Sequence, residues 1–381
     1  MTLNYADLFG DAYAAQAASL VTTIHGVMGD KQLGPAAALE AVEQATAADR
    51  ANLLKRLTKE MLVDPARRIE LDDLVSQEVQ RILKVISDPE RVAGPFGGTS
   101  DEQVVRLATE AQELFELTEP FCASLQVAAR WGSPDALAPW ASGIRAFVQA
   151  ASKTQAGVQG LLALRHLPGM VSVMTAGLAC VASRRWGNLK ALVVDSTIRD
   201  RYEGKPLALL EATDPYKPFD HGDWTTNTLA RAAQSGKSLG EALEELTQNQ
   251  AGKFHTPVAE WLFTMLRPVF KDQLPDDDAY GAEFDRAEVV LGVLAQDAVN
   301  VRIAASPDGG WGGRSHWFGR STWRAAHDHG DPVYDLQHEL ATEGATWGPL
   351  RGELFGGEVD RAKAALDDYA EIFAKIASQR F

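Results

Sequence analysis

Apolar residues recur at helical spacing along most of this chain. The spacing places seven of them, Leu71, Leu74, Val75, Val79, Ile82, Leu83 and Ile86, on one helical face. The first thirty residues have the same spacing, at Leu8, Phe9, Ala12, Tyr13, Leu20, Ile24 and Val27. Strand-like alternation of β-branched residues is scarce. The pattern predicts an all-α fold, an irregular multi-helix assembly of helical hairpins. No repeat of fixed length supports a regular solenoid. A solenoid-like stacking of the hairpins stays open.

The most apolar stretch runs from Met170 to Ala182 and has Arg184 and Arg185 directly after it. It is shorter than the roughly 20 residues that a membrane-spanning helix needs, so we expect a buried core helix and no membrane. Small residues such as Gly177 allow another helix to approach closely. We expect that partner to follow the turn at 186–188, which would make a helical hairpin of residues 170–194.

Breaks in the helical pattern suggest three parts. The chain of 381 residues exceeds the roughly 250–300 residues at which a single core stops growing. The segment 93–100, Ala-Gly-Pro-Phe-Gly-Gly-Thr-Ser, precedes a capping-box pattern at Ser100 and Gln103. We predict an N-terminal helical subdomain over 1–95, a central helical hairpin region over 100–215 and a C-terminal helical subdomain over 216–381.

The charge and the cysteines bear on partners and compartment. The formal charge of −15, from 52 acidic and 37 basic side chains, repels phosphate backbones, so a nucleic-acid partner is not expected. Cys122 and Cys180 lie far apart in the sequence, which argues against a disulfide framework. The first thirty residues contain no Lys or Arg, whereas a secretory signal begins with a positively charged region. These features predict a cytoplasmic protein.

The segment 306–324 concentrates glycine, aromatic and arginine residues without a helical pattern. Aromatic rings can stack on bases and arginines can bind phosphates, but no Walker sequence or dinucleotide fingerprint is present. The alternative is that the aromatic residues, Phe318 among them, anchor a long loop on the core while the arginines pair with carboxylates. The candidate residues for binding a ligand or partner are Trp311, Arg314, His316, Trp317, Arg320, Trp323 and Arg324.

Histidines follow this segment, at His327, His329 and His338. His327 and His329 would present two imidazoles together only on an extended segment, and no Cys pair or His-Glu-x-x-His accompanies them. A hydrogen-bonded turn is the preferred interpretation, with a metal site at His327 and His329 as the alternative. We expect no metal and no cofactor.

Several segments between residues 165 and 325 resemble a known group of proteins. They are Met170–Leu192, Leu207–Asp214, Leu274–Asp278, Phe284–Arg286 and the aromatic residues Phe318 and Trp323. They resemble the helical C-terminal regions of bacterial multidomain proteins with sirtuin-like or other effector domains, many of them associated with antiphage defence. Nothing before residue 165 has the βαβ pattern of a sirtuin-like domain. The resemblance therefore implies a sensor, scaffold or partner-binding module whose effector enzyme lies elsewhere.

Two functional hypotheses follow. In the first, this is a non-catalytic helical interaction or sensor protein, a bacterial antiphage-defence component, that binds a small ligand or a protein partner through residues 306–324. The partner would be an effector enzyme on another chain or a second copy of this one. In the alternative, the chain is a nucleotide-binding regulator or an enzyme whose polar pocket is lined by Arg314, His316, Arg320 and His327.

Overall fold

The computed structural model describes residues 40–43, 45, 47–93, 97–153, 156–200, 204–220, 222–249, 252–305, 313–327 and 329–379. The chain forms two compact units, Met1–Thr46 and Ala47–Phe381. In the first unit, residues 40–43 are helical. The helix expected near residues 8–27 lies outside the described residues. The account below concerns the second unit.

This unit is built from helices, which confirms the all-α prediction. A small antiparallel pair of strands, β1 (Thr197–Arg199) and β2 (Pro206–Ala208), aligns Ile198 with Leu207. The α-helices are α3 (Ala47–Leu62), α4 (Arg68–Ile86), α5 (Pro89–Val92), α6 (Ser100–Trp131), α7 (Ala138–Ala151), α8 (Gln159–Leu164), α9 (Leu167–Ala182), α10 (Trp186–Leu189), α11 (Leu209–Ala212), α12 (Asp223–Ser235), α13 (Leu239–Gln248), α14 (Pro257–Phe270), α15 (Asp277–Ala304), α16 (Arg320–Ala326), α17 (Pro332–Glu343), α18 (Gly348–Arg351) and α19 (Val359–Gln379).

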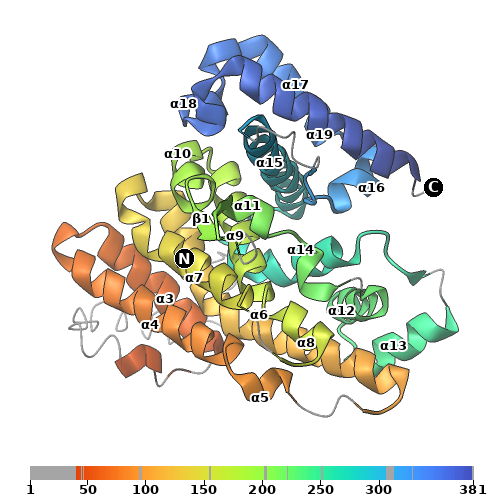
Figure 1. Cartoon of the computed structure of the whole chain (residues 1–381). Helices are drawn as coiled ribbons and strands as arrows, with labels where there is room; N and C mark the ends of the chain where they lie inside the picture. The colour runs from red at the N-terminus through yellow and green to blue at the C-terminus, as the bar shows by residue number, and fades with distance from the viewer. Residues whose placement is uncertain are drawn as a thin grey trace, which may run out of the picture. The chain divides into compact units, whose positions relative to one another are not determined.

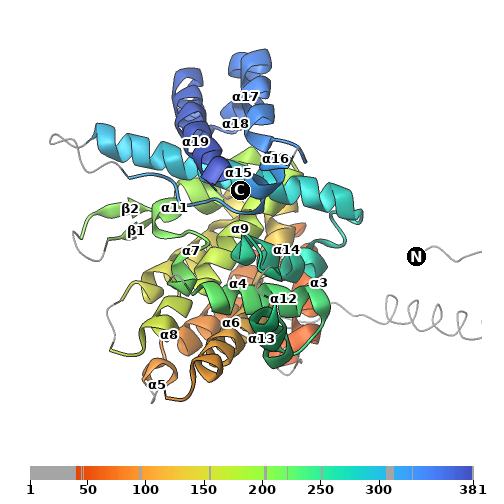
Figure 2. The ribbon, with the colours of Figure 1, turned by 90° about the vertical axis from the view of Figure 1, so that its right-hand side faces the viewer.

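Two long helices organise the packing. Helix α6 contacts α3, α9 and α12, and helix α15 contacts α9, α16, α17 and α19. Figures 1 and 2 show α15 between the core helix α9 and the group α16–α19. Helices from all three predicted parts therefore pack on one another within this unit. The three-part division itself stays a prediction.

Helix α9 lies in the middle of the core, as its apolar composition predicts. Residues 159–182 form the one stretch of the described chain that is apolar and long enough to cross a membrane, and 83% of its most apolar window is buried. A Cβ atom at Gly177 would lie 2.7 Å from Leu291 Cδ1, so the small residue lets α9 approach α15 closely. The close partner at Gly177 is therefore α15 and not the helix expected after a turn at 186–188. The expected helix is replaced by the short helix α10 and a π-helical turn, Lys190–Val194.

Local capping chemistry sets several helix starts. Ser238 and Glu241 form a reciprocal capping box at α13. At α6 the box is formed by Thr99 and Glu102, one residue earlier than the predicted pair Ser100 and Gln103. Each box satisfies two of the backbone N–H groups that have no partner within the helix at its start. Cys122 and Cys180 are free and buried, without a disulfide between them.

Candidate functional site

The described part of the Gly-Trp-Arg segment begins at Gly313, so Trp311 lies outside it. Arg314 and His316 are exposed and line a pocket of about 140 Å³ beside α11 and α15. Between them Ser315 is buried, and its backbone N–H donates to Gln296 Oε1 at 2.9 Å. The segment therefore runs along α15 with alternate residues facing inward and outward.

Trp317 and Phe318 belong to the core. Trp317 is 1% exposed, and its indole N–H donates to the carbonyl oxygen of Thr213 at 2.7 Å. The Phe318 ring stacks on Tyr369 with centroids 4.8 Å apart, and Tyr369 Oη donates to the carbonyl oxygen of Trp317. These two aromatic residues thus anchor the segment, as the alternative interpretation predicts. Trp317 has no ring face available for a ligand.

Arg320 enters a buried cluster of carboxylates at the start of α16. Its Nε lies 3.4 Å from Asp285 Oδ1 and 3.7 Å from Glu260 Oε1. Its guanidinium carbon lies 3.7 Å from the centroid of the Phe263 ring. One turn later, Arg324 Nε lies 2.8 Å from Asp285 Oδ2. Both arginines pair with carboxylates of α14 and α15, again as the alternative interpretation predicts.

A third carboxylate, Glu288, holds the first turn of α16. The backbone N–H of Ser321 donates to Glu288 Oε2 at 3.0 Å, and the Ser321 hydroxyl donates to the same oxygen. A Cβ atom at position 319 would lie 1.8 Å from Glu288 Oε1, so only glycine fits there. Glu288 therefore acts as a distant cap for α16 from the middle of α15.

Burial dominates the ionisation of this cluster. Burial raises the pKa of Glu288 to about 7, although the hydrogen bonds from Ser321 act to lower this pKa. It raises the pKa of Asp285 to about 6, against the charges of Arg320 and Arg324. The pKa of Glu260 is also raised by burial. Near neutral pH, Glu288 and Asp285 therefore still release and bind protons, whereas exposed carboxyl groups are already ionised.

The raised pKa of Glu288 predicts that the stability of the fold depends on pH. The folded pKa of Glu288 lies above its ordinary value of 4.5. The stability that the protonated side chain contributes to the fold is therefore fully present below about pH 4.5 and is lost as the pH rises through about 7. Glu288→Gln keeps an oxygen for Ser321 and removes the titration. The difference in free energy of unfolding between this variant and the unchanged chain should vary by on the order of 2 kcal/mol between about pH 5 and about pH 8.

The measurement is denaturant unfolding of both proteins across that pH range. Glu343→Gln replaces an exposed carboxylate at the end of α17 and serves as the control for the change from Glu to Gln. A difference for Glu288→Gln that stays constant from about pH 5 to about pH 8 would contradict the prediction.

Beside this cluster lies a polar pocket of about 240 Å³. The end of α9, the middle of α15, the last turn of α16 and the start of α17 form its walls. They supply side chains of both charges, namely Arg184, Glu283, Asp285, Arg286, Arg324, His329, Asp331 and Asp335.

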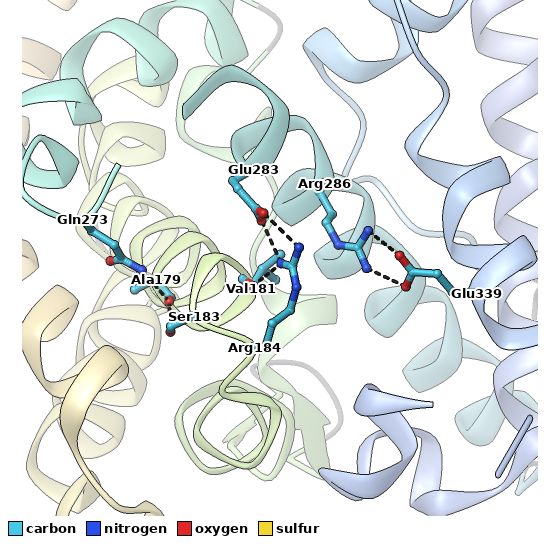
Figure 3. Close-up of polar contacts among 8 residues, drawn as sticks. All are labelled: Ala179, Val181, Ser183, Arg184, Gln273, Glu283, Arg286 and Glu339. Carbon is cyan, nitrogen blue, oxygen red and sulfur yellow. Dashed lines mark hydrogen bonds and ion pairs between the residues drawn. The ribbon is translucent and has the colours of Figure 1, made fainter. Parts of the chain in front are cut away.

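Paired arginines hold two walls of the pocket in place (Figure 3). Arg184, which follows α9, donates from Nη1 and Nη2 to the two carboxylate oxygens of Glu283, both at 2.9 Å. On α15, Arg286 donates in the same manner to Glu339 of α17, at 2.8 and 2.6 Å. Such two-bond pairs fix the orientation of both side chains. They link α9 to α15 and α15 to α17.

Other polar groups of the pocket lack a two-bond partner of this kind within the described chain. The exposed carboxylate of Asp335 and the ring nitrogens of His329 make no polar contact within the described chain. Arg324 uses its Nε for Asp285, and its two terminal nitrogens make no hydrogen bond to a described residue. These groups can therefore bind a polar ligand without breaking an existing pair.

Three histidines, His255, His327 and His329, lie around the Trp323 ring. The rings of His327 and His329 lie 4.4 and 6.2 Å from the Trp323 ring, and His255 stacks on it at 6.4 Å. Among the described residues, no group of three or more His, Cys, Asp or Glu side chains could hold a metal ion. The alternative of a metal at His327 and His329 thus gains no support.

The structure separates the residues of the predicted polar pocket. Arg314 and His316 line the pocket beside α11, Arg320 is buried among carboxylates, and His327 contacts Trp323. Sequence reasoning missed Asp285 and Glu288. The available signal was Glu288 itself, an acidic residue inside the apolar run from Ala287 to Leu294.

Comparisons of the chain with protein-family models, with curated proteins and with solved structures gave no match.

Proposed function

We propose that this chain is a helical binding protein, without catalysis of its own, that detects a small zwitterionic molecule of amino-acid size. The observation that supports the proposal is the pocket of about 240 Å³, in which the terminal nitrogens of Arg324 and the carboxylate of Asp335 make no hydrogen bond to a described residue. An anionic group on the ligand would bind the free nitrogens of Arg324, and an ammonium group would bind Asp335. A ligand with only one kind of charge would leave half of these groups unused.

The size of the pocket favours a small ligand over a nucleotide. Pockets that enclose drug-sized ligands measure roughly 300–1,000 Å³, and the two pockets near the Gly-Trp-Arg segment measure about 240 and 140 Å³. Arg320, which a nucleotide-binding pocket was expected to use, is 7% exposed and surrounded by carboxylates. The nucleotide-binding alternative is therefore the less supported of the two.

Occupancy of the pocket would couple three helices. Its walls come from the end of α9, from α15 and from α17, and a ligand that contacts all three would favour the arrangement in which they lie together. This coupling is why we propose a sensor, with a protein partner that responds to the bound state. An effector enzyme as that partner, a role in antiphage defence and a location in the cytoplasm belong to the same proposal.

The test is a thermal-shift and calorimetry screen of the full chain with the standard amino acids, ATP and NAD. A ligand at about one hundred times its Kd should stabilise the folded chain by about 2.7 kcal/mol. Asp335→Asn should abolish the shift without changing the melting temperature of the free protein, because Asp335 is exposed and unpaired within the described chain.

Glu343→Gln, a carboxylate on the same helix outside the pocket, should bind as the unchanged chain does. If no amino acid shifts the melting temperature, or if Asp335→Asn binds as tightly as the unchanged chain, the proposal is wrong. A response to ATP or NAD alone would favour the nucleotide-binding alternative.

A further inference from the structure

A second surface, lined by no described residue of the Gly-Trp-Arg segment, lies between α3 and the end of α6. Lys55, Lys59, Leu62 and Val63 line it on one side, Gln126, Arg130 and Trp131 on the other, and Asp272 after α14 completes it. We call these eight residues the α3–α6 surface. It encloses about 400 Å³, more than the pocket beside α15.

Large apolar side chains of this surface are exposed to solvent. Val63 is 82% exposed and Trp131 is 62% exposed. The guanidinium carbon of Arg130 lies 4.5 Å from the centroid of the Trp131 ring, so one ring face is covered and the other is open. Tryptophan and arginine are the residue types that contribute most to binding at protein interfaces.

The charge of the α3–α6 surface is opposite to that of the whole chain. Lys55 Nζ lies 2.9 Å from Asp272 Oδ2, and this contact, with weaker effects of Lys59 and Arg130, lowers the pKa of that carboxyl group. Three cations therefore surround one carboxylate. Lys59 and Arg130 form no ion pair within the described chain, so the surface has two cations to offer on a protein of net charge −15.

We propose that the α3–α6 surface docks an acidic segment of a partner protein, with one or two carboxylates beside an apolar or aromatic side chain. The carboxylates bind Lys59 and Arg130, and the apolar side chain packs on the open face of Trp131 and on Val63. This inference is independent of the small-ligand proposal, because the two sites share no residue.

The number of free cations distinguishes an acidic peptide from a nucleic acid. Proteins that bind duplex DNA tightly make about 6–10 phosphate contacts, and the net charge of −15 repels a polyanion at long range. Two free cations match one or two carboxylates. The exposed apolar side chains add the contact area that a short peptide needs to bind specifically.

The test is selection of a random-peptide display library on the full chain, followed by fluorescence anisotropy of the selected peptides. We expect peptides in which Asp or Glu stands near an aromatic or large aliphatic residue. Trp131→Ala and the pair Lys59→Glu with Arg130→Glu should each weaken their binding by about tenfold or more. Both changes lie at the surface, and the melting temperature of Trp131→Ala should match that of the unchanged chain.

Two controls match these variants. Tyr334→Ala removes another aromatic side chain that is 62% exposed, and Lys363→Glu reverses an exposed charge on α19. Both should bind the selected peptides within about twofold of the unchanged chain. Selected peptides without acidic residues, or equal binding by Trp131→Ala, would overturn the proposal. Loss of single-stranded DNA binding in the same variants, with no acidic peptide selected, would assign the surface to nucleic acid instead.

Discussion

Arg320→Met is expected to lower the free energy of unfolding by about 3 kcal/mol or more. Asp285 is the nearest carboxylate to Arg320 and also pairs with Arg324. The loss of Arg320 leaves Asp285, which is 5% exposed, with Arg324 as its remaining partner, and it removes the cation 3.7 Å from Glu260. Removing one partner of a buried ion pair costs more than removing both, because the remaining charge keeps its desolvation penalty.

The double variant Asp285→Asn with Arg320→Met tests this explanation. Methionine fills much of the space between Phe263 and Phe284, which face the arginine at 3.7 and 6.0 Å. The double variant should be more stable than Arg320→Met alone, as judged by the midpoint of denaturant unfolding. If the double variant is the less stable of the two, the buried charge does not cause the loss.

Trp317→Ala is expected to destabilise the fold by about 3–5 kcal/mol, the usual cost of truncating a buried tryptophan. The side chain is 1% exposed, and its N–H bond to Thr213 would be lost with its packing. The measurement is denaturant unfolding of Trp317→Ala beside Trp131→Ala, whose side chain is 62% exposed and whose stability should change by less than about 0.5 kcal/mol.

This pair of variants separates the two interpretations of the Gly-Trp-Arg segment. An anchoring tryptophan contributes to stability, whereas a tryptophan that binds a ligand contributes to affinity. A Trp317→Ala protein that unfolds like the unchanged chain would restore Trp317 as a binding residue.

The parts of the fold that were predictable depend on neighbours in the sequence. Apolar spacing predicted helices such as α4, and the capping-box pattern at Ser100 and Gln103 predicted the start of α6 to within one residue. These interactions form between residues three or four positions apart, so a local pattern is sufficient to recognise them. The one-residue error at Thr99 arose because Thr99 and Ser100 can both cap a helix.

The candidate site was less predictable because its residues are distant in the chain. The segment 306–324 was recognised by its composition, but the partners of Arg320 and Ser321 are carboxylates more than thirty positions earlier. Arg184 and Glu283 lie 99 positions apart, and Arg286 and Glu339 lie 53 positions apart. Local patterns contain no information on which helix faces meet.

The sequence by itself determined that this is a helical protein with an apolar central helix, because helical periodicity and burial depend on residue type and local spacing. Only the tertiary structure decided that Trp317 is an anchor, that Arg320 is buried beside Asp285, and that Arg324 and Asp335 line one pocket. Those outcomes depend on how α15 packs against α14, α16 and α17. Helix packing is determined by the fit of whole side-chain surfaces, which no single segment specifies.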